Sequence, residues 1–168
     1  MGIDLTIFGD FSDNMLVQKR AVNEIISYNE ETLNYGLVLT EQQAIELVRT
    51  RNIALRDNGR IEFGGGIIGK IINEFCDSPY LTMENYEYTL HELIEMFYYY
   101  KDETLDLMGD DELIKFMKRS FDGICQGSLE LLSSRELYNL ARSLRFGKQD
   151  SGDKDDDNDE EDDDDGEY

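Results

Sequence analysis

The sequence predicts an all-α protein that folds as a single compact domain of about six helices. Apolar residues recur at helical spacing in successive runs from residue 13 to residue 147, and strand–helix alternation is missing. The chain also contains a single proline, Pro79, so few positions forbid a helix. Its 168 residues, of which 40% are hydrophobic, are enough to bury the core of one such helical bundle.

The N-terminal region changes its period near residue 12. Apolar and polar residues alternate from Ile3 to Ile7, which predicts a short extended arm over residues 1–11. Helical spacing begins at Asp13, and Gly36 is a fitting stop because glycine readily adopts the left-handed conformation that ends helices. The first helix is therefore expected between these two positions.

The next two helices have clear boundaries. Thr40 and Gln43 have the spacing of a capping box, which predicts a helix that runs on to Gly59. Another apolar run follows a group of three glycines, and Ser78-Pro79 ends it because the residue before proline disfavours the helical conformation.

A long tyrosine-rich helix is predicted after Thr82, which can act as its N-cap. Residues 96–100 read Met-Phe-Tyr-Tyr-Tyr and are apolar or amphipathic on all sides, so this helix is expected to be central. Tyr88 and Tyr99 lie opposite its main apolar stripe. Either a second layer of core covers them or they form an exposed contact. We expect the covering layer, because a buried tyrosine with its hydroxyl bonded is the commoner case.

Two further helices complete the predicted domain, which spans residues 1–147. Negative charge at Asp110 favours the start of one helix, because the helix dipole is positive there. Ser133 or Ser134 is expected to cap the last helix, which ends near Gly147.

Residues 148–168, called the acidic tail below, are predicted to be disordered. They contain 13 acidic and 2 basic residues and no aliphatic side chain, so they cannot bury enough surface to offset their ordering entropy. The whole chain has a net charge of −22. Such charge disfavours binding to nucleic acids and to anionic membranes, and it leaves another protein, especially a basic one, as the expected partner.

The cysteine content and hydropathy predict a cytoplasmic protein. Cys76 and Cys125 are the only cysteines and form no short Cys-x-x-Cys pair, which is typical of a reducing compartment. No apolar run approaches the roughly 20 residues that a membrane-spanning helix needs.

Two phosphate-binding patterns match the stretch "RIEFGGGIIGK" incompletely. Gly64, Gly66 and Gly69 fit G-x-G-x-x-G, and Lys70 extends the match towards the P-loop pattern. However, Ile71 replaces the Ser or Thr that would contact magnesium, and a capped helix rather than a strand precedes the glycines. We therefore predict a structural glycine turn at Gly64–Gly66 and expect no nucleotide or other cofactor.

A ligand-binding alternative remains for the glycine turn. Backbone N–H groups at the start of a helix, with basic side chains nearby, can hold one anion or a carboxylate. The candidate binding residues, for an anion or for a partner, are Arg60, Gly64, Gly65, Gly66 and Lys70.

Glu87, His91 and Glu95 form the candidate metal-binding row, because they lie four residues apart on one helix face. His91 is the only histidine of the chain, so His91-Glu92-x-x-Glu95 lacks the second histidine of the zinc-protease motif. The row lies beside the apolar stripe, and a solvated charged face is the expectation.

Three stretches together resemble a family of uncharacterised proteins from clostridia-type Gram-positive bacteria: "VQKRAVNEIISYNEETLNYGLVLT", "RIEFGGGIIGKIINEFCDSPY" and "FYYYKDETLD". The resemblance covers about residues 8–147. It implies a bacterial cytoplasmic protein, and it implies no functional residues because the family has no assigned activity.

The sequence contains no complete catalytic constellation, so we expect a non-enzymatic helical module for protein–protein interaction. The alternative is a protein that binds a small ligand, an anion or a divalent metal. That protein would use the Gly64–Gly66 turn or the Glu87, His91 and Glu95 row.

Overall fold

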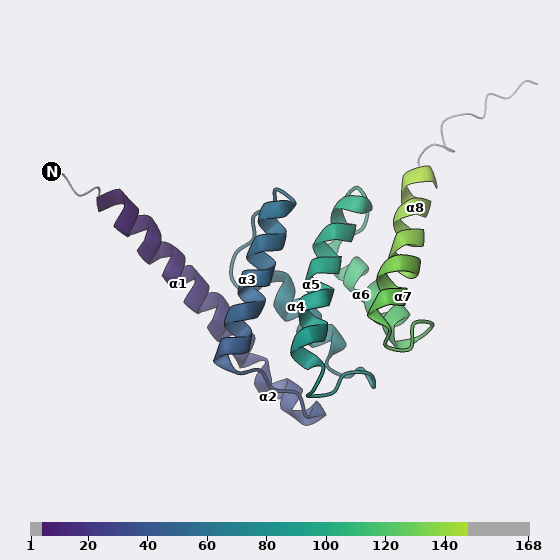
Figure 1. Cartoon of the computed structure of the whole chain (residues 1–168), viewed down its shortest axis with the longest axis horizontal. Helices are drawn as coiled ribbons and strands as arrows, with labels where there is room; N and C mark the ends of the chain where they lie inside the picture. Colours follow the sequence, from purple (N-terminus) through teal and green to yellow (C-terminus); the bar gives the residue numbers. More distant parts are fainter. Residues whose placement is uncertain (1–4, 148–168) are drawn as a thin grey trace, which may run out of the picture.

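The computed structural model describes residues 5–147, with side chains from Met15 onwards, and these residues form helices and no strands (Figure 1). The all-α prediction is therefore confirmed. The predicted acidic tail, residues 148–168, lies outside the described residues, as do residues 1–4.

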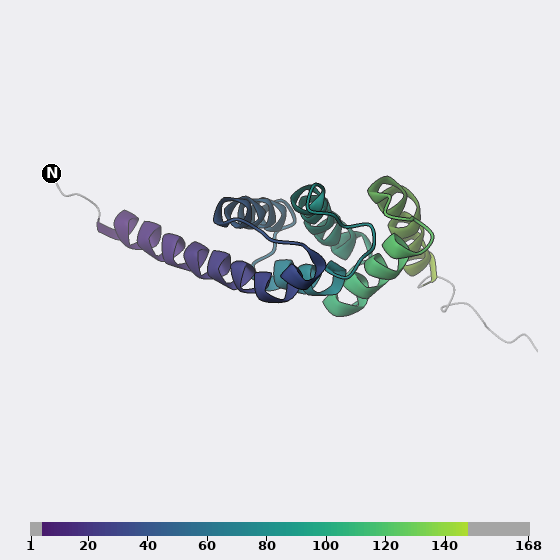
Figure 2. The ribbon, with the colours of Figure 1, turned by 90° about the horizontal axis from the view of Figure 1, so that it is seen from below.

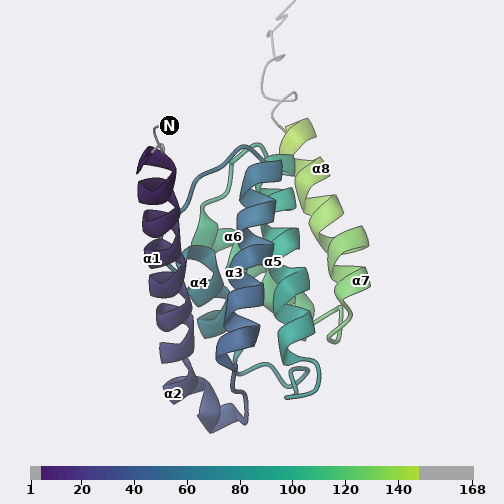
Figure 3. The same ribbon diagram turned by 60° about the vertical axis from the view of Figure 1, so that its left-hand side comes forward.

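The helices are arranged in two layers. In chain order they are α1 (Leu5–Ser27), α2 (Asn29–Thr32), the 3-10 turn η1 (Leu33–Tyr35), α3 (Glu41–Asp57), α4 (Gly66–Phe75), α5 (Tyr86–Glu103), α6 (Asp110–Asp122), α7 (Leu129–Leu131), the π-helical segment η2 (Leu132–Leu137) and α8 (Tyr138–Gly147). Helices α3, α5 and α8 stand side by side in one layer, and α1, α4 and α6 form the other (Figures 2 and 3). None of the described helices is long and apolar enough to cross a membrane.

Helix α1 begins at Leu5, so the predicted extended arm is wrong for residues 5–11. The alternation that suggested an arm covers only a few positions. Ile7, Phe11 and Met15 are spaced four residues apart, which is also a helical period and continues into the rest of α1. Figure 1 shows the N-terminal half of α1 extending away from the other helices.

The local signals around α3 are confirmed by hydrogen bonds. Thr40 Oγ1 accepts from the Gln43 N–H at 3.1 Å, and Gln43 Oε1 accepts from the Thr40 N–H at 2.9 Å, which completes the capping box. Gly36 ends η1 with a φ of 74°, in the left-handed region that favours glycine. Both signals were readable because each depends on residues a few positions apart.

Helix α5 begins later than predicted. Asn85 Oδ1 accepts from the Thr82 N–H at 2.9 Å, and Asn85 Nδ2 donates to the Tyr80 carbonyl at 3.0 Å. These bonds hold a turn in front of the helix, so Asn85, rather than Thr82, precedes its first residue, Tyr86.

The last helical run begins earlier than predicted. Ser128 Oγ accepts from the Leu131 N–H at 3.2 Å and caps α7, whereas Ser133 and Ser134 lie inside η2. Ser134 Oγ donates to the Glu130 carbonyl at 2.7 Å, a bond that serine can make within a helix.

Helix α5 is central, as predicted, because it packs against α3 and α8 in its own layer and against α4 and α6 in the other. Its buried residues include Tyr86, Phe97 and Tyr98. Tyr88 and Tyr99 are exposed, by 63% and 55%, so the expected second core layer over them is wrong. The described helices leave these two side chains open to solvent.

Tyr86 provides a test of the core. Its buried hydroxyl forms no hydrogen bond of normal geometry among the described residues, and the nearby Thr32 hydroxyl donates to the Leu37 carbonyl instead. Burial raises the pKa of Tyr86 to about 12, and Thr32 opposes only part of this shift. In the unfolded chain the pKa is about 10, so the unfolded state loses this proton first. The contribution of Tyr86 to the free energy of unfolding should therefore be complete below pH 10 and should be lost progressively between about pH 10 and 12.

We predict that Tyr86→Phe raises the free energy of unfolding at pH 7 by about 1 kcal/mol, because it removes an unsatisfied polar group. It should also reduce the alkaline loss of stability, although the buried Tyr98 retains its own share. Urea unfolding at neutral and alkaline pH measures both effects, with Tyr88→Phe on the exposed face as the control. An unchanged alkaline loss in Tyr86→Phe would contradict this assignment.

Candidate functional site

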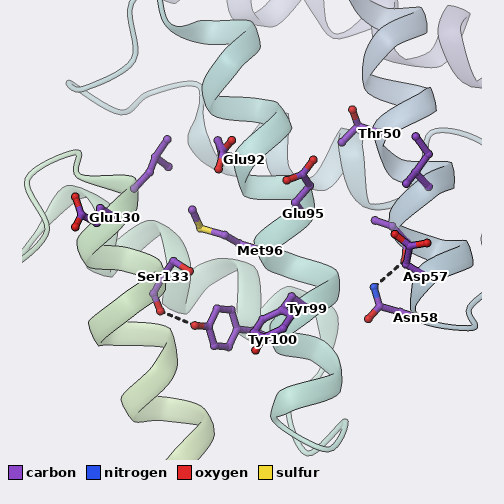
Figure 4. A pocket seen from close by; sticks show the side chains of 13 residues that line it. Thr50, Asp57, Asn58, Glu92, Glu95, Met96, Tyr99, Tyr100, Glu130 and Ser133 are labelled. Atoms are coloured by element: carbon purple, nitrogen blue, oxygen red, sulfur yellow. Dashed lines mark hydrogen bonds between the residues drawn. The ribbon is translucent and has the colours of Figure 1, made fainter.

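A hollow of about 660 Å³ lies over α5 (Figure 4). Helix α3 forms one wall, and α7 with η2 forms the other. The hollow, called the α5 groove, is lined by Thr50, Ile53, Ala54, Asp57, Asn58, Glu92, Glu95, Met96, Tyr99, Tyr100, Leu129, Glu130 and Ser133. Its position follows from the central place of α5 between two neighbours in one layer.

Two neighbouring tyrosines form a platform in the α5 groove. The rings of Tyr99 and Tyr100 contact edge to face, with centroids 4.9 Å apart. The Tyr100 hydroxyl donates to the Ser133 carbonyl at 2.5 Å, which ties the platform to η2 (Figure 4). Tyr100 is thus fixed by the opposite wall, while Tyr99 presents its ring to solvent.

The π-helical geometry of η2 gives the Ser133 wall an unusual backbone. Short π-helical segments are rare and are found frequently at functional sites. Here the segment places the Ser133 carbonyl within reach of Tyr100, directly beside the α5 groove. This observation adds weight to the groove as a candidate site.

A second hollow, of about 410 Å³, lies on the other side of the tyrosine pair. It is lined by Tyr99, Tyr100, Glu103, Tyr138, Ala141, Arg142, Arg145 and Phe146. Arg145 forms an ion pair with Glu103 at 3.1 Å, and the Arg142 guanidinium lies 5.7 Å from the centre of the Phe146 ring. The two hollows share the tyrosine platform but differ in charge.

The rim of the α5 groove is negative. Asp57, Glu92, Glu95 and Glu130 line it, and the described residues that join them include no lysine or arginine. Asp57 lies 3.7 Å from the exposed Arg56. The three glutamates have no ion-pair partner among residues 15–147, whose side chains are described, so their charges are left for solvent or a ligand.

The glycine turn contains two residues with positive φ. Gly64 has a φ of 64° and Gly66 has a φ of 49°, values that residues other than glycine rarely adopt. Arg51, only 2% exposed, donates to the Gly64 carbonyl and lies 3.6 Å from Glu62 Oε1. The turn is therefore packed around a buried charge.

Carboxylates of the protein itself occupy the backbone amides of the turn. Glu62 Oε1 accepts from the Ile67 N–H at 2.6 Å, and Glu24 Oε2 accepts from the Gly65 N–H at 2.9 Å. The Tyr98 hydroxyl also donates to Glu62, and burial together with this bond raises the pKa of Tyr98. An external anion would have to displace these carboxylates to reach the same amides.

The structure does not bring the basic candidates into contact with the turn amides. The Arg60 guanidinium binds Asp102 at 2.6 Å and Asp106 at 2.8 Å. Lys70 pairs with Asp111 at 2.9 Å, and this hydrogen bond raises the pKa of Lys70. Binding at Arg60, Gly64, Gly65, Gly66 and Lys70 stays a prediction, without the convergence of charges that motivated it.

The candidate metal row is only partly assembled. His91 Nδ1 lies 2.7 Å from Thr50 Oγ1, and His91 Nε2 lies 3.5 Å from Glu87 Oε1. Glu95 instead lines the α5 groove (Figure 4). His91 is half-buried between α3 and α5, so the expected solvated face is only partly solvated at this position. Within the described residues, no three acidic, cysteine or histidine side chains are placed to hold a metal ion.

The α5 groove was not predicted from the sequence. The available signal was the position of Tyr99 opposite the apolar stripe, which allowed either a second core layer or an exposed contact. Choosing between the two needs the positions of α3 and α7, because these helices form walls beside Tyr99 and leave its ring uncovered.

The chain belongs to a family of unknown function, DUF6323, whose match covers residues 24–150. This confirms the resemblance to an uncharacterised family at that level. The matched range begins within α1 and includes the glycine turn and the α5 groove. No curated protein and no solved structure matches the chain.

Gly66→Ala tests the structural role of the turn. Gly66 has positive φ, and an added Cβ would overlap the Glu62 carboxylate. We predict a loss of about 1–3 kcal/mol in the free energy of unfolding, without any ligand present. Lys70→Ala should leave stability nearly unchanged, because it removes the ion pair with Asp111, and exposed ion pairs contribute little to stability.

Urea unfolding of the two variants measures this difference. A second series in about 1 mM ATP tests the nucleotide alternative, since a ligand that binds only the folded state raises its stability. Stabilisation of the wild type by ATP, lost in Lys70→Ala, would contradict the structural interpretation.

Proposed function

We propose that this protein is a non-enzymatic helical module that binds another protein through the α5 groove. The Tyr99–Tyr100 platform carries the proposal. Tyrosine supplies a large, rigid contact area and is enriched at protein interfaces. Ile53, which is 50% exposed, adds apolar surface from the α3 wall. A partner that covers these side chains removes apolar surface from water.

The placement of the reactive groups supports a role without catalysis. Arg60 and Lys70 are paired with carboxylates, and the Glu24 and Glu62 carboxylates are bonded to the backbone of the turn. Burial raises the pKa of the Cys76 thiol and also that of Cys125, which disfavours a reactive thiolate.

The charge of the chain supports a protein partner over nucleic acids and anionic membranes, because a net charge of −22 repels both. A bacterial cytoplasmic setting is part of the proposal. It rests on the resemblance to proteins of clostridia-type bacteria and on the two unpaired cysteines.

A small ligand is the second candidate, because the α5 groove has a volume within the range of about 300–1,000 Å³ typical of small-molecule sites. This candidate includes an anion at the glycine turn and a metal at the Glu87, His91 and Glu95 row. Native mass spectrometry separates it from the first proposal, since a stoichiometric small molecule or metal adds a defined mass to the chain.

We predict that Tyr99→Ala weakens partner binding by about tenfold or more, as expected when a central aromatic contact is truncated. Purified wild type and variant serve as baits in extracts of the source organism, and quantitative mass spectrometry measures the bound proteins. Tyr88→Ala is the matched control, because Tyr88 is equally exposed on α5 but does not line the groove. Equal recovery by Tyr99→Ala and Tyr88→Ala would contradict the assignment of the groove.

A further inference from the structure

The carboxylates of the α5 groove lie on three sides of its floor. Glu92 and Glu95 are three residues apart on α5 and therefore share one face of the helix. Asp57 extends from α3 and Glu130 from α7 (Figure 4). Like charges gathered without cations between them repel one another, so a positively charged ligand would relieve this repulsion.

The floor between these carboxylates is apolar. Met96 and the Tyr99 ring lie along α5, Ala54 belongs to the α3 wall, and Leu129 belongs to the α7 wall. From Glu92 to Tyr100 the floor extends about 12 Å along the helix axis, because each residue adds about 1.5 Å. This length corresponds to about two turns of a helix.

We propose that the α5 groove binds an amphipathic helix of a partner protein that carries lysine or arginine on both sides of an apolar stripe. The proposal rests on the proposed function and specifies the partner. The apolar stripe contacts Met96 and Tyr99, and the flanking cations lie against Glu92, Glu95 and Glu130. Helices with an apolar stripe of this kind commonly bind in grooves of other proteins.

The charge of the rim disfavours other occupants. A second copy of this chain has a net charge of −22, and the acidic tail carries 13 acidic residues, so the rim repels both. A small polyamine would neutralise the carboxylates but would leave the Tyr99 ring exposed. A basic amphipathic helix matches both the charge and the apolar floor.

The second hollow determines on which side of the tyrosine platform the cations of the partner lie. Arg142 lies beyond the tyrosine platform, on the α8 side, and would repel a cation placed there. The cationic side chains of the partner therefore lie over Glu92 and Glu95 rather than over α8.

Binding of synthetic peptides to the full chain tests the proposal. The probe is a fluorescent peptide of about 14 residues with leucine at helical spacing and lysine elsewhere. A scrambled peptide of the same composition lacks the stripe, and a third peptide has glutamate in place of lysine. We expect the helical lysine peptide to bind at least about tenfold more tightly than either of the others.

Two double variants show where on the protein the peptide binds. Glu92→Gln with Glu95→Gln should weaken binding by about fivefold, the combined effect of two exposed charge pairs. Glu30→Gln with Glu31→Gln removes the same charge from α2 and should change binding by less than about twofold. Circular dichroism confirms that the variants are folded, and Arg142→Gln should leave binding unchanged or strengthen it.

Three other outcomes would overturn the proposal, and each would identify a different reason. Equal weakening by the two double variants would mean that the peptide binds the acidic surface without using the groove. The lysine and glutamate peptides could bind equally well to the wild type and both lose binding in Tyr99→Ala. That result would agree with the proposed function but would contradict the inference that the partner is basic. If Tyr99→Ala affects no peptide, the basic helix does not bind in the groove and this proposal fails, whereas the proposed function is decided by the recovery of partners with Tyr99→Ala and Tyr88→Ala.

Two further measurements separate the remaining occupants. Spermidine binding that depends on Glu92 and Glu95, but not on Tyr99, would identify a small cation as the ligand and overturn the proposal. Analytical ultracentrifugation of the protein alone tests for a second copy. A dimer that Tyr99→Ala dissociates would place that copy in the groove and also overturn the proposal.

Discussion

The buried Arg51 side chain is the constraint on which the path of the chain between α3 and α4 depends. Its charge is almost completely removed from water, and a buried charge that loses its partners destabilises a fold by several kcal/mol. Glu62 must therefore return to α3, within 3.6 Å of Arg51. The same carboxylate bonds the start of α4 and the Tyr98 hydroxyl of α5, so one residue connects three helices.

This constraint also separates structural groups from groups available for function. The amides of Gly65 and Ile67, which could have bound an external anion, are bonded to Glu24 and Glu62. By contrast, Glu92 and Glu130 have no ion-pair partner among the described residues, and they lie beside the tyrosine platform of α5. Carboxylates without an ion-pair partner among the described residues therefore lie on the groove, which supports a role in recognition.

Structural features that depend on neighbouring residues are predictable from the sequence, and those that depend on distant residues are not. The capping box at Thr40 and the stop at Gly36 were readable because their bonds close within a few positions. The partners of Lys70 and of Glu62 lie on other helices, 41 and 36 residues further along the chain, so no local pattern could identify them. The exposure of Tyr99 likewise depends on which helices pack beside α5. A short alternation near Ile7 predicted an arm where a longer window shows a helix.

Hydrogen exchange at the Gly65 and Ile67 amides shows whether carboxylates of the protein itself complete the glycine turn. In the wild type we expect both amides to be protected, because each is hydrogen-bonded, and about 10 mM sulfate should leave their exchange unchanged. Glu62→Ala should release the Ile67 amide to faster exchange while amides in the middle of α5 remain protected. Fast exchange of both amides in the wild type, slowed by sulfate, would show a vacant anion site in place of the bonds to Glu24 and Glu62.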